Sequence, residues 1–214
     1  VSPILNKTNH RLVIGFLPLK VRINYMYSNL STTTNLFAQV LESFKLDLTD
    51  PNFIETPQRM AKAYAELLYG HTPQAMSELQ RLVYRTFPQS TSSMVVVRNI
   101  RCTGLCPHHL LPVHYSINFG YINSDKVIGL SKIPRILQIL TKRAVMQEDL
   151  AVDIGKFFMT HLQPLGIGVH LKGNHACMQL RGVEERDSDM IVMHLEGDFN
   201  LPHVKSEFQQ LITL

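Results

Sequence analysis

The sequence contains no tryptophan, only three cysteines and few charged residues, which make up 18% of its 214 positions. A small, odd number of cysteines argues against a secreted disulfide framework. It favours a reducing compartment, in which a cysteine is more often a metal ligand or a nucleophile. Because 45% of the residues are hydrophobic, the chain is too apolar to be disordered and long enough to bury a core. We therefore expect a folded cytoplasmic protein.

Long hydrophobic runs are also missing. The apolar stretch Leu12–Leu19 lies between Arg11 and Lys20, and it is much shorter than the ~20 residues that a membrane-spanning helix needs. A secretory signal peptide is the alternative interpretation of this stretch, but no small-residue cleavage site follows it. The sequence predicts no membrane segment.

The net charge of +4 comes from 21 lysines and arginines against 17 acidic residues, and the basic residues are spread along the chain. This balance suits an anionic small-molecule substrate as well as nucleic acid. We expect an irregular N-terminal arm over residues 1–33, a helical region over residues 34–90 and one main domain over residues 91–214.

The spacing of apolar residues gives the order of the elements. Helical spacing from Leu36 to Phe44 predicts a first helix, and the pairs Thr56–Pro57 and Thr72–Pro73 mark the starts of two more. The later segments are predicted as two strands, two helices and two strands, over Met94–Cys102, Tyr115–Tyr121, a helix from Ile133, a helix from Gln147, Gly166–Lys172 and Met190–Phe199. This order predicts an α+β fold, an antiparallel sheet with helices on one face.

Two clusters of cysteine and histidine suggest a metal site. Cys106 and His109 are three positions apart in a predicted loop, and Cys177 follows His175 at the end of a predicted strand. Strand pairing could bring Cys106, His109 and Cys177 together as zinc ligands. Three protein ligands leave a fourth position for water, as a hydrolytic site requires, and histidines such as His108 and His175 can then carry protons.

The spacing leaves two other interpretations open. Cys102 precedes Cys106 by four residues, so it could complete a closed Cys₃His structural site together with Cys106, His109 and Cys177. Such a zinc module could bind nucleic acid through basic residues without any turnover. The cysteines could also be ordinary buried thiols, with the histidines in surface loops.

Several residues are suited to bind an anion. Ser131 is a candidate N-cap, and Lys132 and Arg135 follow in the first turn of a predicted helix, where a phosphate or a solvated surface turn fits equally well. Arg181 is a candidate phosphate clamp, and its alternative role is a surface ion pair with Glu184 or Glu185.

Gln147 and Glu148 lie in the first turn of another predicted helix. An acid at this position is ordinarily explained by the helix dipole, but a carboxylate can also accept two hydrogen bonds from the edge of a guanine base. Spacing alone does not decide between the two.

Taken in order, Cys106-Pro-His-His, Gly129-Leu-Ser-Lys, Gln147-Glu148, His175-Ala-Cys177 and Arg181-Gly-Val resemble the signature of the GTP cyclohydrolase I family. The resemblance runs from about Leu41 to the C-terminus and includes Glu55-Thr-Pro-Gln-Arg59, Lys62 and Glu207-Phe208. It implies a tunnelling fold, with a four-stranded antiparallel sheet and two helices on one face, preceded by N-terminal helices. Residues 91–214 would then form the catalytic domain. The family assembly is a homodecamer with active sites between subunits.

The resemblance also implies roles for single residues. Cys106, His109 and Cys177 would bind Zn²⁺, His108 and His175 would assist catalysis, and Glu148 would anchor guanine with help from Gln147. The triphosphate would be held by Lys62, Ser131, Lys132, Arg135 and Arg181. The implied reaction opens the imidazole ring of GTP and gives 7,8-dihydroneopterin triphosphate and formate, the first step of pterin and folate biosynthesis, with no organic cofactor.

The sequence departs from the family pattern at two places. Pro107 stands where the family usually has glutamate, and the segment 188–196 lacks the usual threonines. A paralogue that acts on another purine or pterin, or that stops at an opened-ring intermediate, is therefore an alternative. A nitrile-reducing relative is disfavoured because it needs a metal-free nucleophilic cysteine.

Overall fold

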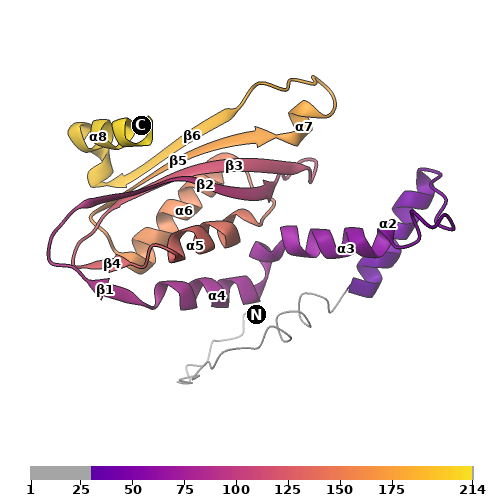
Figure 1. Cartoon of the computed structure of the whole chain (residues 1–214), viewed down its shortest axis with the longest axis horizontal. Coiled ribbons are helices and arrows are strands. Elements are labelled where there is room, and N and C mark those ends of the chain that lie inside the picture. The colour runs from indigo at the N-terminus through magenta and orange to yellow at the C-terminus, as the bar shows by residue number, and fades with distance from the viewer. Residues whose placement is uncertain (1–29, 214) are drawn as a thin grey trace, which may run out of the picture.

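A four-stranded antiparallel sheet in the order β2-β3-β5-β6 forms the centre of the molecule (Figure 1). The computed structural model describes residues 30–213. The strands are β2 (Met94–Leu105), β3 (Pro112–Ile122), β5 (Gly166–His175) and β6 (Met190–Gly197). Two helices, α5 (Lys132–Thr141) and α6 (Gln147–Leu162), lie on one face of this sheet, which confirms the predicted α+β fold.

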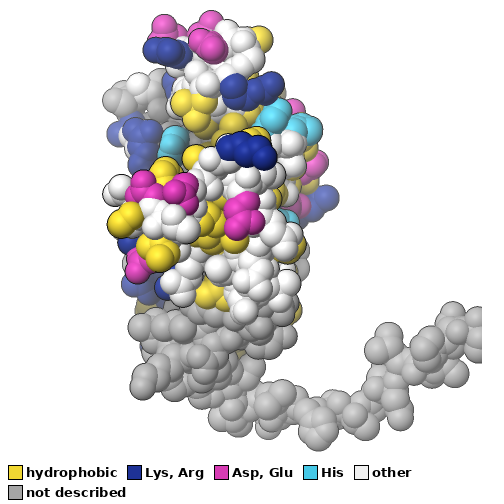
Figure 2. Space-filling model, turned by 90° about the vertical axis from the view of Figure 1, so that its right-hand side faces the viewer, with side chains coloured by type: hydrophobic (Ala, Val, Ile, Leu, Met, Phe, Trp, Pro, Cys, Tyr) yellow, Lys and Arg dark blue, Asp and Glu magenta, His cyan; other side chains and the backbone are white. Residues whose placement is uncertain are grey.

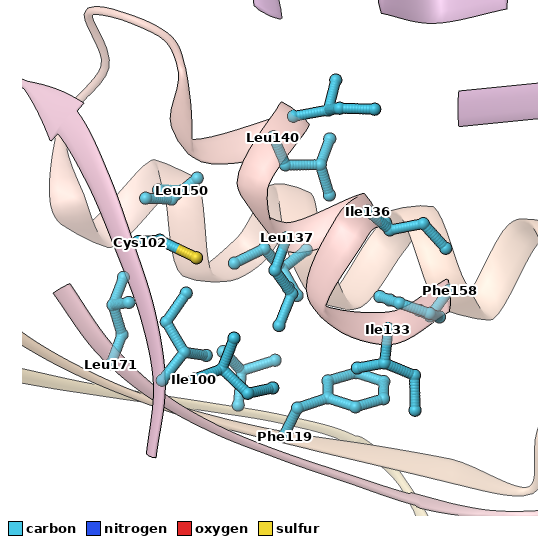
Figure 3. Packing of buried hydrophobic residues seen from close by; sticks show 14 of the residues in the cluster. Ile100, Cys102, Phe119, Ile133, Ile136, Leu137, Leu140, Leu150, Phe158 and Leu171 are labelled. Carbon is cyan, nitrogen blue, oxygen red and sulfur yellow. The ribbon is translucent and has the colours of Figure 1, made fainter. Parts of the chain in front are cut away.

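The alternation of β3 decides which face is covered by helices. Its residues Val113, Tyr115, Ile117, Phe119 and Tyr121 are all buried, because every second side chain of a strand points to the same face. Figure 3 shows Phe119 packed beside Ile133 of α5 and Phe158 of α6. Fully burying such a side chain contributes about 1.5–3 kcal/mol to the stability of the fold.

Among residues 30–213, the opposite face of the sheet is covered at one end, by helix α8 (Pro202–Thr213) and the short helix η2 (Asp198–Asn200). Phe199 and Phe208 rest there on two glycines of the sheet. A Cβ atom at Gly168 would lie 2.5 Å from Phe199 Cδ1, and one at Gly120 would lie 2.9 Å from Phe208 Cε2. Farther along, this face carries polar cross-strand pairs such as His114–Asn174.

The expected N-terminal helices are confirmed as α2 (Leu30–Ser43), α3 (Thr56–Leu67) and α4 (Pro73–Val83), with η1 (Tyr69–His71) before α4. The Thr72 hydroxyl caps α4 by accepting the amide N–H of Ala75 at 3.2 Å. Helices α2 and α3 extend away from the sheet (Figure 1), and the rings of Phe37 and Tyr64 stack between them. Residues 1–29 of the expected arm lie outside the described residues, and residues 30–33 already belong to α2.

Four details differ from expectation. Ser131 occupies the N-cap position of α5, but its side chain makes no capping hydrogen bond because its backbone is already helical. Strand β6 ends at Gly197, whose positive φ of 59° turns the chain so that Phe199 reaches the core. Two short elements were not predicted, the helix α7 (Ala176–Gln179) and the two-stranded sheet of β1 (Thr86–Pro88) and β4 (Lys126–Ile128).

None of the helices between residues 30 and 213 has the length and apolar character needed to cross a lipid bilayer.

Candidate metal centre and active site

The tip of the β2–β3 hairpin carries Cys106 and His109, two of the three candidate metal ligands; we call the set Cys106, His109 and Cys177 the metal-type cluster. The amide of Cys106 donates to the Leu111 carbonyl at 2.9 Å, and the amide of Leu110 donates to the Cys106 carbonyl at 2.8 Å. Neither bond uses an N–H at position 107, and a proline ring fixes φ near the value that a turn requires. Pro107 therefore suits this turn and leaves the geometry of Cys106 and His109 intact.

Strand pairing brings the second cluster to the first. Val113 of β3 pairs with His175 of β5, so β5 ends beside the hairpin tip, and α7 then turns the chain to place Cys177. The ligand atoms of Cys106, His109 and Cys177 all lie within 4.8 Å of one another, and Cys106 Sγ is 3.8 Å from His109 Nδ1. Two thiols and one imidazole are a donor set that zinc prefers, so these residues fit that ion.

Cys102 does not belong to this group. It lies among Leu137 and Leu150 in the core (Figure 3), and burial raises the pKa of its thiol to about 11. Among the described residues the metal-type group has three members and does not include Cys102. The arrangement therefore favours an open three-ligand site over the closed Cys₃His alternative.

Burial raises the pKa of the Cys177 thiol, the neighbouring Cys106 thiol raises it further, and the Arg181 guanidinium opposes the shift. Without a cation, it is unfavourable for both thiols to be ionised at once, because two negative charges would then lie close together in a partly buried site. A divalent cation removes that cost, which is a second reason why the site fits a metal.

Gln147 holds His175 in place. Its buried amide Nε2 donates to the carbonyls of Leu171 and Met190, each at 2.9 Å, and its Oε1 is 2.9 Å from His175 Nε2. Because Oε1 can only accept, the proton of the imidazole sits on Nε2. Gly173 makes room for this amide, since a Cβ there would collide with Oε1. All the polar atoms of the Gln147 side chain are engaged within the protein.

The charge around His175 is set by two opposing effects. Burial lowers the pKa of His175, and the nearby Glu148 carboxylate raises it, with burial the larger effect. His175 is therefore neutral at pH 7 and can accept a proton. His108 lies on the exposed hairpin tip, with its Nδ1 3.7 Å from Cys106 Sγ.

Sequence reasoning missed Tyr115. Its ring is buried, and burial together with Cys106 and Glu148 raises the pKa of its phenol to about 12. The negative charge of both groups thus acts on the phenol. In the sequence Tyr115 is only one member of an alternating strand, so it could not be told from the other core residues.

Arg181 contacts the cluster directly. Its guanidinium nitrogen is 3.1 Å from His109 Nε2, and within the described part of the chain it forms no ion pair with Glu184 or Glu185. Lys62 is exposed on α3. The same helix meets the hairpin tip through Tyr64, whose hydroxyl donates to the Leu110 carbonyl at 3.3 Å.

Ser131, Lys132 and Arg135 lie elsewhere in the chain. The C-terminal end of α5 lies close to the end of β2 that leads to Cys106. There the Leu105 amide donates to the carbonyl of Arg143, just after the helix, at 3.2 Å. The first turn of α5 is about 14 Å away from the last along the helix axis. Figure 1 shows this start of α5 beside β4, at the end of the sheet opposite α7. One chain therefore does not bring these three residues to Cys106.

The end of the molecule that carries α7 is seen in Figure 2. Basic (dark blue), acidic (magenta) and histidine (cyan) side chains alternate over this surface. A mixed surface of this kind gives no support to a nucleic-acid interface at this end.

The fold and the site define a class of protein, an α+β protein in which a Cys₂His cluster suited to a metal lies beside a histidine and a carboxylate. A sequence model of the GTP cyclohydrolase I family matches residues 33–213. The chain belongs to the GTP cyclohydrolase I family and is an enzyme.

Individual relatives agree with this assignment. The chain is 38% identical over 180 residues to the GTP cyclohydrolase 1 of Leptospira biflexa, covering 83% of this chain and 96% of that protein. It is 34% identical to the enzyme of Methylococcus capsulatus, over 85% of this chain and 97% of the relative. The enzyme of Saccharomyces cerevisiae is 32% identical, over 81% of this chain and 70% of its own length.

Among solved structures, the archaeosine synthase QueF-Like in the apo form matches with a TM-score of 0.40 and 17% identity, covering 50% of this chain and 97% of that one.

We expect Gln147→Leu to destabilise the fold by about 2 kcal/mol, because it removes the partner of the buried Leu171 carbonyl, of the partly buried Met190 carbonyl and of the His175 N–H. Urea unfolding of the variant, followed by circular dichroism, measures this loss. Gln209→Leu changes an exposed glutamine of α8 and should alter the free energy of unfolding by less than about 0.5 kcal/mol. Equal stability of the two variants would contradict the assigned hydrogen bonds.

Proposed function

We propose that this enzyme converts GTP to 7,8-dihydroneopterin triphosphate and formate with the help of a zinc ion held by Cys106, His109 and Cys177. The observation that carries the proposal is the convergence of three groups at one end of the sheet. These are the metal-type cluster, the Gln147–His175 pair and the Glu148 carboxylate. Membership of the family supports the same reaction. The reaction would supply pterin and folate biosynthesis with its first intermediate.

A zinc ion held by Cys106, His109 and Cys177 would supply Lewis acidity for the hydrolytic steps. The proton transfers fall to the two histidines beside the cluster. His175 is neutral and oriented by Gln147, so it suits the role of proton acceptor, and we assign proton delivery to N7 of the base to His108, whose Nδ1 is 3.7 Å from Cys106 Sγ. The buried Tyr115 borders the cluster and helps to exclude water from that side.

Glu148 is assigned to the recognition of guanine. Its carboxylate is exposed at the start of α6, and it acts on both His175 and Tyr115. A carboxylate accepts the N1–H and the 2-amino group of guanine together, whereas adenine offers no such pair of donors. The amide of Gln147 is already hydrogen-bonded within the protein and is not free to bind guanine. Gln147 therefore contributes by holding His175 in place.

We assign the binding of the triphosphate to basic residues and one serine from two chains. Arg181 and Lys62 would come from the chain that holds the zinc, and Ser131, Lys132 and Arg135 from a second copy, because they lie at the other end of their own sheet. Strands β2 and β6 are both edge strands, and head-to-tail pairing of such edges closes a ring. This supports a homo-oligomer, and the resemblance to the family implies a decamer. The unpaired thiols Cys102, Cys106 and Cys177 suit the cytoplasm.

We expect Glu148→Gln to weaken GTP binding by roughly 30- to 150-fold, or about 2–3 kcal/mol, because an amide cannot accept both guanine hydrogen bonds. Zinc content should not change. Asp149→Asn is the matched control, since Asp149 shares the first turn of α6 and the same helix dipole. Fluorescence titration with a GTP analogue compares the two variants. Equal weakening in both would assign Glu148 to the dipole and remove it from the guanine site.

One observation favours a second candidate, an enzyme that stops at an opened-ring product. Pro107 takes the place of the usual glutamate, so the hairpin tip has one carboxylate fewer for the later steps. Product identification separates this candidate from the complete reaction, because only the complete reaction yields neopterin triphosphate.

A further inference from the structure

The ring of Tyr115 leans along the sheet toward the metal-type cluster. Tyr115 pairs with Cys102 of β2 and with Gly173 of β5, but its ring also reaches Gly104, which lies two residues farther along β2 toward Cys106. A Cβ atom at Gly104 would lie 3.0 Å from Tyr115 Cε2, and one at Gly173 would lie 3.1 Å from Tyr115 Cε1. Two glycines therefore make room for this ring at the end of the sheet that carries the site.

The side chain of Gln147 shares the space above Gly173 with this ring. A Cβ atom at Gly173 would collide with Gln147 Oε1 as well as touch the ring of Tyr115. The same Oε1 is 2.9 Å from His175 Nε2. The ring of Tyr115 is therefore a neighbour of the pair that we assign to proton transfer.

The phenol of Tyr115 is a hydrogen-bond donor that the fold itself does not use. Tyr115 is only 2% exposed, and within residues 30–213 no hydrogen bond engages its oxygen, yet no buried polar side-chain atom there is left without a partner. The oxygen is therefore not sealed in the core but borders open space. Burial, and after it the charges of Cys106 and Glu148, raise the pKa of the phenol to about 12, so it keeps its proton near neutral pH.

The proposed reaction restricts how guanine lies in the site. Its C8 has to face the metal-type cluster, and its N1–H and 2-amino group have to face Glu148. The ribose on N9 has to point outward, because Lys62 and Arg181, the proposed triphosphate ligands of this chain, are exposed. On the purine ring, O6 lies on the edge between N1 and N7, away from N9. This edge therefore faces the interior, where Tyr115 is buried.

We propose that Tyr115 is a specificity-determining residue of this site and that its phenol donates a hydrogen bond to O6 of the guanine base. Glu148 accepts from the 2-amino group and N1–H, so the two residues together read three adjacent groups of one base. A base without an acceptor at position 6 leaves the phenol unpaired in a desolvated site, and the site rejects it for that reason. The inference rests on the proposed function and deepens it.

The test is calorimetric titration of the zinc-loaded full chain with 7-deaza-GTP and with its 6-thio derivative. Both nucleotides keep the N1–H and the 2-amino group, and neither can be opened at C8 because carbon replaces N7. Sulfur in place of O6 is a weak acceptor. We expect Tyr115→Phe to weaken the binding of 7-deaza-GTP about five- to tenfold and to change that of the 6-thio derivative by less than about twofold.

Tyr121→Phe is the matched control, because Tyr121 is a second buried tyrosine on the same face of β3, nearer the other end of the strand. It should leave both affinities unchanged. Urea unfolding of Tyr115→Phe should show the parental midpoint, since no partner of the phenol within the protein is lost.

Three results would overturn the proposal: no binding of 7-deaza-GTP to the parent chain, unchanged affinities in Tyr115→Phe, or an equal loss for both nucleotides in that variant. An equal loss with a lowered unfolding midpoint would assign the phenol a structural role. Failure of the proposed function gives a different result. A selective loss for 7-deaza-GTP in Tyr115→Phe, without any turnover of GTP by the parent, would support the O6 contact and reject the reaction.

Discussion

Cys106→Ser is expected to lose zinc and to lower GTP turnover by about 1000-fold or more. Serine is a poor zinc ligand because its hydroxyl stays protonated near neutral pH, whereas a thiol ionises readily beside a cation. The ion contributes several kcal/mol to the stabilisation of charge in the transition state, and ~4 kcal/mol corresponds to about 1000-fold in rate. Elemental analysis gives zinc per chain, and formate release gives turnover.

Cys102→Ser is the matched control, because Cys102 is a buried thiol outside the metal-type group. This variant should keep its zinc, although the polar hydroxyl in the core lowers its stability by about 1–2 kcal/mol. Zinc at the parent level in Cys106→Ser would reject the ligand assignment. Loss of zinc in Cys102→Ser from a folded chain would instead support a closed four-ligand site.

Mixing two inactive variants is expected to restore activity. A Cys106→Ser chain lacks the metal site but keeps Arg135, and an Arg135→Ala chain keeps the metal site but lacks part of the proposed triphosphate site. Because the start of α5 and the hairpin tip lie at opposite ends of the sheet, the proposed site would combine residues of two chains. Random co-assembly of equal amounts should recover roughly one quarter of the parental activity. Formate release is measured after joint unfolding and refolding.

The control mixture combines Cys106→Ser with Cys177→Ser. Both residues belong to the same cluster in one chain, so no combination of the two variants builds a complete metal site. This mixture should stay inactive. Equal recovery in both mixtures, or no recovery in the first, would contradict the assignment of Arg135 to a second chain.

The periodicity of the sequence was sufficient to predict the four main strands and the helices that pack on them. The alternation in Tyr115–Tyr121 and the helical spacing after Ile133 follow from burial on one face, and burial is a property that sequence patterns report well. The three-residue strands β1 and β4 and the four-residue α7 are too short to show a period. Their existence depends on tertiary contacts.

The metal-type cluster could be predicted because cysteine and histidine occur there at ligand spacing, and strand pairing had only to join two motifs. The role of Gln147 could not be predicted, since its partners Leu171 and Met190 offer backbone carbonyls that no side-chain pattern reveals. The separation of Arg135 from Cys106 was equally hidden. It depends on the direction in which α5 crosses the sheet.

The most direct test of the account is to incubate the zinc-loaded enzyme with GTP and to identify all products by chromatography with mass and fluorescence detection after oxidation. The account predicts equal amounts of formate and of a neopterin triphosphate, and neither product when the metal is removed by a chelator. Unchanged GTP in the presence of bound zinc, or an opened-ring product without any neopterin, would contradict it.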